Sequence, residues 1–161
     1  TTPPVSPPIK MDYLGALLSY LIPGLGQITQ GRIAKGLLFM VCLHSLFFYG
    51  MYLGKWRNVY LPTNYTRYQF FGQAPIGMAA WPALYQYAVY DANAQVVPLH
   101  GYMSSPSVVE LNDLQRDSDK TWDLGWVYTV IAGVLNVLVI YDALAGPAFR
   151  RTSVPPNPQP A

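Results

Sequence analysis

The sequence predicts an all-α membrane protein with three transmembrane helices, one short re-entrant or interfacial helix and proline-rich extended termini. Of the 161 residues, 52% are apolar and 11% are charged, whereas an average soluble domain has roughly 25% charged residues. Two apolar stretches are each long enough to cross a bilayer. Acidic residues are absent from 13 to 90 and crowd between 110 and 123, as they would if a membrane separated the two regions.

Length and charge narrow the possible functions. A chain of 161 residues fits a single domain. The net charge of +2 gives no basic face for a nucleic-acid partner. The single cysteine, Cys42, lies within an apolar run, so no intramolecular disulfide is expected. Phosphate-binding glycine loops, zinc-protease motifs and paired cysteine motifs do not occur in the sequence.

The two ends of the chain are rich in proline. Residues 1–10 read TTPPVSPPIK, and the tail over 148–161 ends in TSVPPNPQPA. Proline fixes φ and has no N–H to donate, so both ends are predicted to be extended arms. Residues 11–147 between them are predicted to form one integral membrane domain.

The first predicted span covers residues 12–30 and contains a break. The apolar stretch YLGALLSYLI is followed by PGLGQITQG, in which Pro23 and Gly24 kink or end a helix. In hydrocarbon, neighbouring helices must satisfy the backbone groups that such a break leaves free. We therefore expect this segment to pack against the next helix as a hairpin, with close approach at Gly15, Ser19 and Gly26.

The second and third spans are predicted over residues 35–54 and 123–146. The first of these carries no charge after Lys35, and its length corresponds to about 30 Å of helix. The other is flanked by Trp122, Trp126 and Tyr141, as the aromatic belts of a membrane interface require.

Residues 73–90 are ambiguous because the apolar, aromatic stretch is interrupted by Pro75 and Pro82. They form either a short re-entrant or interfacial helix or a kinked fourth span. Residues 91–122 are predicted to be a polar, acidic loop.

The distribution of basic residues leaves the number of spans open. Three spans place Arg32 and Lys35 on the same side as Arg150 and Arg151. Four spans instead group a larger set of basic residues on the cytoplasmic side, namely Lys10, Lys55, Arg57, Arg67, Arg150 and Arg151.

One segment resembles known membrane proteins. Residues Ile22 to Phe39 read IPGLGQITQGRIAKGLLF, a proline-glycine turn, Gly-Gln, a further glycine and Lys-Gly at the start of a membrane helix. This pattern is similar to the two-transmembrane-helix domain superfamily. With FGQAPIGMAAWPAL and DLGWVYTVIAGVLNVLVIYDALAG, the chain from Tyr13 to Pro147 looks like an uncharacterised bacterial family of small integral membrane proteins. The resemblance implies a helix hairpin and the bacterial inner membrane, and it supplies no catalytic residues.

Small and polar residues mark the expected helix contacts. In the last span they recur at spacings of three and four on one face, where Asn136 is expected to bond between helices. Asp142, one turn from the helix end, is expected to pair with Arg150 and Arg151. The full set comprises Gly15, Ser19, Pro23, Gly24, Gly26, Gln27, Gly31, Lys35 and Gly36 in the first hairpin, and Gly125, Thr129, Gly133, Asn136 and Asp142 in the last span.

His44 is the candidate cofactor-binding residue, because an ionisable group near the middle of a membrane helix is costly. Its imidazole is a possible ligand for a haem iron or a pigment magnesium. The other histidine, His100, lies in a polar segment and does not complete a two-histidine site. We favour the alternative in which His44 hydrogen-bonds a carbonyl or Ser19, Tyr49 or Asn136, with no cofactor.

These observations predict a non-catalytic accessory subunit of a larger bacterial membrane complex, such as one for electron transfer or light capture. Its partners are the lipid bilayer and larger integral membrane subunits. The alternative is a small homo-oligomeric transporter or channel component built around Asn136 and His44. A cofactor carrier using His44 is the weakest of the three hypotheses.

Overall fold

The computed structural model describes residues 11–62, 68–89, 98–117 and 120–146, and it is helical with no strand in these ranges. The all-α prediction is therefore confirmed for them. The elements in chain order are α1 (Tyr13–Leu21), α2 (Leu25–Thr29), α3 (Ile33–Leu53), α4 (Tyr68–Gln73), the 3-10 helix η1 (Ala74–Ala80), α5 (Trp81–Val89), the 3-10 turn η2 (Pro98–Gly101), α6 (Val108–Asp117) and α7 (Thr121–Ala145).

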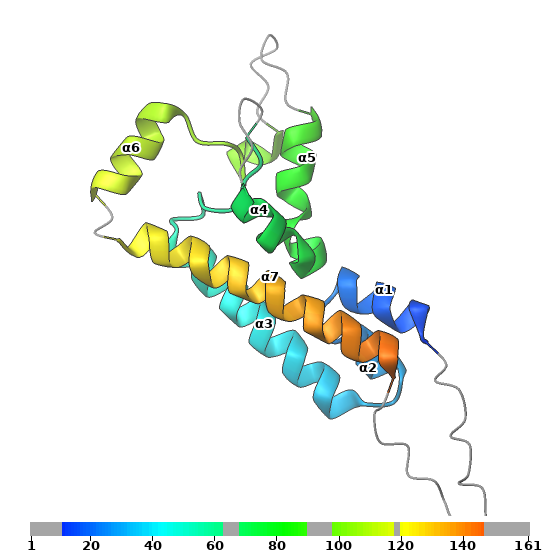
Figure 1. Ribbon diagram of the computed structural model, residues 1–161. Coiled ribbons are helices and arrows are strands. Elements are labelled where there is room, and N and C mark those ends of the chain that lie inside the picture. Colours follow the sequence, from blue (N-terminus) through cyan, green and yellow to red (C-terminus); the bar gives the residue numbers. More distant parts are fainter. Residues whose placement is uncertain (1–10, 63–67, 90–97, 118–119, 147–161) are drawn as a thin grey trace, which may run out of the picture.

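Helices α3 and α7 lie side by side and form the long axis of the molecule (Figure 1). They have 21 and 25 residues and are, among the described residues, the two helices long and apolar enough to cross a membrane. Gly50, late in α3, packs against Gly125, early in α7, so the two helices run antiparallel. They correspond to the predicted spans over 35–54 and 123–146, and each begins two residues earlier.

The predicted span over residues 12–30 does not form one continuous helix. Helix α1 ends at Leu21, and Gly24 adopts a φ of +87° that turns the chain back into α2. Both ends of the segment reach the same end of α7, because the Asp12 N–H donates to the Leu144 carbonyl at 2.9 Å and the Gln30 amide donates to the Ala143 carbonyl at 2.7 Å. We call residues 12–30 the re-entrant hairpin. Three spans are therefore not confirmed.

The hairpin is compact because its glycines allow backbones to touch. A Cβ on Gly26 would overlap the carbonyl oxygen of Gly15 in α1, and a Cβ on Gly24 would overlap that of Gly36 in α3. Such contacts between small residues are typical of closely packed membrane helices. The hairpin thus packs against the second predicted helix, as expected, although it does not extend along the full length of that helix.

The ambiguous segment over 73–90 begins at Gln73, the last residue of α4, and its described part is divided into two short helices, η1 and α5. The Pro75 carbonyl accepts a hydrogen bond from the Asn136 amide at 2.7 Å, which places η1 beside the middle of α7. At Gly77 the backbone has φ +81° and ψ −133° and touches the carbonyl oxygens of Tyr20 and Leu21, at the tip of the hairpin. Beyond this contact, α5 leads away from α7 (Figure 1). This segment therefore does not form a single fourth span.

Residues 91–122 were predicted to be a loop but contain regular structure in their described part. They include η2 and α6, and α7 already begins at Thr121. Helix α6 carries acidic and apolar residues and is linked to the end of α3 by an ion pair between Arg57 and Glu110 at 3.2 Å. The predicted terminal arms over 1–10 and 148–161 lie outside the described residues.

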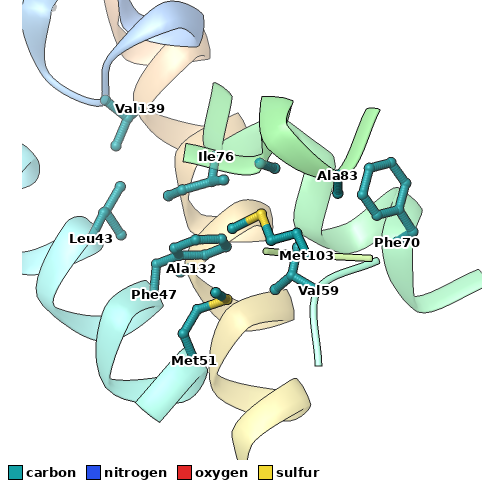
Figure 2. Packing of buried hydrophobic residues seen from close by; sticks show 11 residues of the cluster. Leu43, Phe47, Met51, Val59, Phe70, Ile76, Ala83, Met103, Ala132 and Val139 are labelled. Carbon is teal, nitrogen blue, oxygen red and sulfur yellow. The ribbon is translucent and has the colours of Figure 1, made fainter. Parts of the chain in front are cut away.

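The buried core lies where α3, α7 and the short helices meet (Figure 2). Phe47 and Met51 of α3 and Ile76 of η1 are fully buried, and Met103, which follows η2, closes the cluster at 1% exposure. These residues anchor the short helices to one half of the α3–α7 pair.

The contact at Gly77 can be tested by comparison with Gly31, since both have φ near +80° but only Gly77 is crowded. Gly77→Ala is expected to destabilise the protein by about 2 kcal/mol more than Gly31→Ala, because only the first adds a steric overlap. Thermal unfolding of the purified protein in mild detergent measures the difference. Equal losses for both variants would contradict this close contact.

Candidate functional site

The most polar part of the helical interior surrounds Asp142, near the C-terminal end of α7. One carboxylate oxygen lies 2.7 Å from the Lys35 ammonium and the other lies 2.8 Å from the Arg32 guanidinium. The hairpin brings these cations there, because its return leaves Arg32 at the start of α3. Arg150 and Arg151, the partners expected from the sequence, lie outside the described residues.

Gln27 connects this ion cluster to the inside of the hairpin. Its amide nitrogen donates to the Val139 carbonyl at 2.8 Å and to Asp142 at 3.2 Å. Its side-chain oxygen accepts from the Ser19 hydroxyl at 3.0 Å, and that hydroxyl accepts from the Gly26 N–H. Gln27 and Ser19 are completely buried. The chain of bonds therefore joins α1, α2 and α7 through side chains that have no contact with solvent.

Asn136 lies on α7 ahead of Val139 and Asp142 in the sequence, and it is also completely buried. Its amide nitrogen donates to the Ser19 carbonyl at 3.1 Å and to the Pro75 carbonyl at 2.7 Å. Both carbonyls belong to places where a helix is interrupted, and there the backbone needs an external donor. Asn136 thus bridges the hairpin and η1.

A second polar cluster lies nearer the other end of α7. The Gln73 amide donates to the Thr129 hydroxyl at 2.8 Å and to the Asn58 carbonyl at 3.1 Å. The Asn58 amide donates to the Gly50 carbonyl at 3.0 Å. Gln73 and Asn58 were not among the candidates from the sequence. Gln73 could have been noticed as an amide within an otherwise apolar, aromatic segment, whereas Asn58 directly follows Lys55, Trp56 and Arg57 and has no such signal.

Asp12 and Gln30 join the two ends of the hairpin and were likewise not singled out. The Asp12 carboxylate accepts from the Gly15 N–H at 2.9 Å and from the Gln30 amide at 2.9 Å. These bonds hold the pKa of Asp12 below its usual value of 3.8. An Asp directly before a helical apolar run is the usual N-cap signal, so Asp12 was identifiable from the sequence.

His44 is half-buried and bonds within its own helix. Its Nδ1 lies 2.8 Å from the Met40 carbonyl, and its ring stacks on Phe48 at a centroid distance of 6.2 Å. No group of three or more metal-ligating side chains occurs among the described residues. The contact with the Met40 carbonyl is the one expected of a helix-packing histidine, and cofactor binding by His44 stays a prediction.

The remaining candidates lie at backbone contacts, with one exception. Gly31 is exposed in the turn before α3 and has open space around it. Pro23 is buried in the hairpin turn. Gly24, Gly26, Gly36, Gly125 and Gly133 each face a neighbouring backbone, Gly15 faces the side chains of Gln30 and Asp12, and Thr129 accepts from Gln73.

Comparison with known proteins gives one finding about this chain. The model of a family of unknown function, DUF6677, matches residues 14–155. This range includes the network from Ser19 to Asp142 and both long helices. No curated protein and no solved structure matches.

The hydrogen bonds to Asp12 make the stability of the hairpin depend on pH. Because its pKa is lowered in the folded state, the charged carboxylate stabilises the protein above the unfolded pKa of about 3.9. This contribution is lost as the pH falls through the lower folded pKa. The free energy of unfolding of the wild type is therefore expected to fall more steeply on acidification than that of Asp12→Asn. In addition, Asp12→Ala removes the cap and is expected to cost about 1 kcal/mol at neutral pH. If the free energy of unfolding falls equally steeply with pH in the wild type and in Asp12→Asn, the role assigned to Asp12 is wrong.

Proposed function

The chain belongs to DUF6677, a family of unknown function, and we propose that it is a membrane-embedded, non-catalytic accessory subunit that binds larger integral membrane subunits. The observation that carries the proposal is the contrast between a polar interior and an apolar exterior. Of the most apolar 18-residue stretch of each long helix, only 28% is buried in α3 and 33% in α7. A core helix of a soluble protein would be mostly buried instead.

The exposed faces of the two long helices are large and apolar. In water such a surface would be an aggregation liability, whereas lipid chains or the helices of a partner cover it in a membrane. The exposed residues on α3 include Leu37, Leu38, Val41, Phe48, Tyr49 and Tyr52, and those on α7 include Leu124, Ile131, Val134, Leu135, Leu138 and Tyr141.

The polar interior supports a structural role. A catalytic site needs a nucleophile or base that converges with other groups on an open space. Gln27, Gln73 and Asn136 are instead completely buried and donate to backbone carbonyls or neighbouring side chains. Their bonds hold interrupted helices together, which is what a small subunit needs in order to present a fixed surface to its partners.

We also propose the bacterial inner membrane as the location, and the support for it is that the sequence of Ile22–Phe39 resembles small bacterial membrane proteins. A second function, a homo-oligomeric transporter or channel component, is favoured by one observation. The hairpin and η1, both interrupted helices, meet beside the middle of α7, and transporters often place their binding sites at such junctions. The complete burial of Asn136 weighs against an open path there.

Membrane insertion with two spans predicts the sides on which the chain ends lie. In a Cys42→Ser background, Met11→Cys and Ala145→Cys are expected to react with a membrane-impermeant thiol reagent from the same side. Asp123→Cys, at the other end of α7, is expected to react from the opposite side. All three positions are exposed. Reaction of positions 11 and 145 from opposite sides would show three spans and overturn the re-entrant hairpin.

The accessory role is tested by native mass spectrometry of the protein purified from its own membranes in mild detergent. We expect it to co-elute with larger membrane proteins in a fixed stoichiometry. A homo-oligomer would instead favour the transporter or channel component, which a flux assay in liposomes then tests. A bare monomer, stable in the same detergent, would contradict both functions.

A further inference from the structure

A groove with a volume of about 370 Å³ lies between α3 and α7. Its walls are apolar along most of its length, and its charged residues, Lys35 and Asp142, lie near the hairpin end of the two helices. The apolar lining comprises Leu38, Phe39, Cys42 and Leu43 from α3 and Leu135, Leu138 and Val139 from α7.

The charged end of the groove contains the ion cluster around Asp142. Arg32 and Lys35 share the single carboxylate of Asp142. An ammonium has three N–H donors, and one of those of Lys35 faces Asp142 while 41% of the side chain remains exposed. The Nη1 atom of Arg32 is buried and has no hydrogen-bond partner within the part of the chain that the structure describes. Arg32 does not line the groove and its Nη1 atom has no access to it, so Lys35 is the cation that can still donate to an anion there.

The position of the groove along the helices matches an amphiphile. Lys35 is the third residue of α3, and Cys42 lies two turns deeper, at about 10 Å along the axis. If α3 crosses a bilayer, the charged end lies at headgroup depth and the apolar walls lie among the acyl chains. A peptide fits poorly, because the apolar walls offer few partners for its backbone groups.

We propose that this groove binds one acyl chain of an anionic phospholipid, whose phosphate is held by Lys35. The inference rests on the membrane location in the proposed function and is independent of any partner subunit. Asp142 fixes Lys35 in place and Arg32 offsets the charge of Asp142, so the positive charge of Lys35 favours an anionic headgroup over a zwitterionic one.

Cys42 provides the test, because it is the only cysteine in the chain and it is exposed in the groove wall. The full chain in mild detergent is titrated with phosphatidylglycerol, with phosphatidylcholine of the same acyl chains, or with inorganic phosphate. Mass spectrometry follows the rate at which Cys42 is alkylated. Phosphatidylglycerol is expected to protect Cys42 at about fivefold lower concentration than phosphatidylcholine, as one additional charge interaction predicts. Phosphate alone is expected to leave the rate unchanged.

Variants separate the charge from the groove. Lys35→Gln keeps an N–H donor for Asp142 but removes the positive charge, so it is expected to abolish the preference for phosphatidylglycerol. Lys55→Gln, just beyond the opposite end of α3, is the matched control and should keep the preference. A thiol at Val137, exposed on α7 but outside the groove, is introduced as Val137→Cys in a Cys42→Ser background and should not be protected.

Equal protection by the two lipids would overturn the proposal, as would equal protection of the thiol at position 137. Protection by inorganic phosphate alone would assign an ion site in place of a lipid site. The comparison of lipids on the wild type remains decisive even if Lys35→Gln does not fold. Since the isolated chain is used, a negative result here leaves the accessory function untouched, and the absence of partners in native mass spectrometry leaves the lipid site untouched.

Discussion

The structure depends on the bonds that Gln27 and Asn136 make to α7 and to backbone carbonyls. A chain that turns back at Pro23 and Gly24 leaves helix-end groups without intrahelical partners, and an apolar environment makes each such group costly. Asn136 reaches such carbonyls from α7, at Ser19 and Pro75, and Gln27 reaches from the hairpin to the Val139 carbonyl of α7. Because one amide can donate two bonds, two side chains hold the hairpin, η1 and α7 together.

The same constraint explains where the small residues lie. The hairpin can approach α7 and α3 closely enough for amide side chains to span the gap only where no Cβ intervenes. Gly24 against Gly36 and Gly26 against Gly15 bring the hairpin within reach of Asp142, and the two cations follow at the start of α3. The ion cluster and the groove beside it are therefore a consequence of how the hairpin packs.

The sequence predicts the two long helices well and the interrupted segments less well. The uninterrupted apolar length of α3 and α7 is a local property, and so it can be read directly. Residues 12–30 have enough apolar residues for a span, but their direction is decided by Gly24 and by Gln27 bonding to Val139, 112 residues later. Asn136 and Asp142 attract attention as polar residues in an apolar helix, whereas the carbonyls that Asn136 reaches and the cations paired with Asp142 appear only in three dimensions. Gln73 was not a candidate from the sequence, although the structure places it fully buried beside Thr129.

The wide sequence separation between the hairpin and α7 also imposes an order on synthesis. The Gln27 side chain emerges from the ribosome long before Val139 and Asp142, and at about 5–20 residues per second the interval is on the order of ten seconds. Throughout that time, Ser19 is the partner that the hairpin itself supplies to the Gln27 side chain. The hairpin is therefore made as an incomplete unit, and its hydrogen bonds are completed only when α7, the last of the described helices, delivers the Val139 carbonyl and the Asp142 carboxylate.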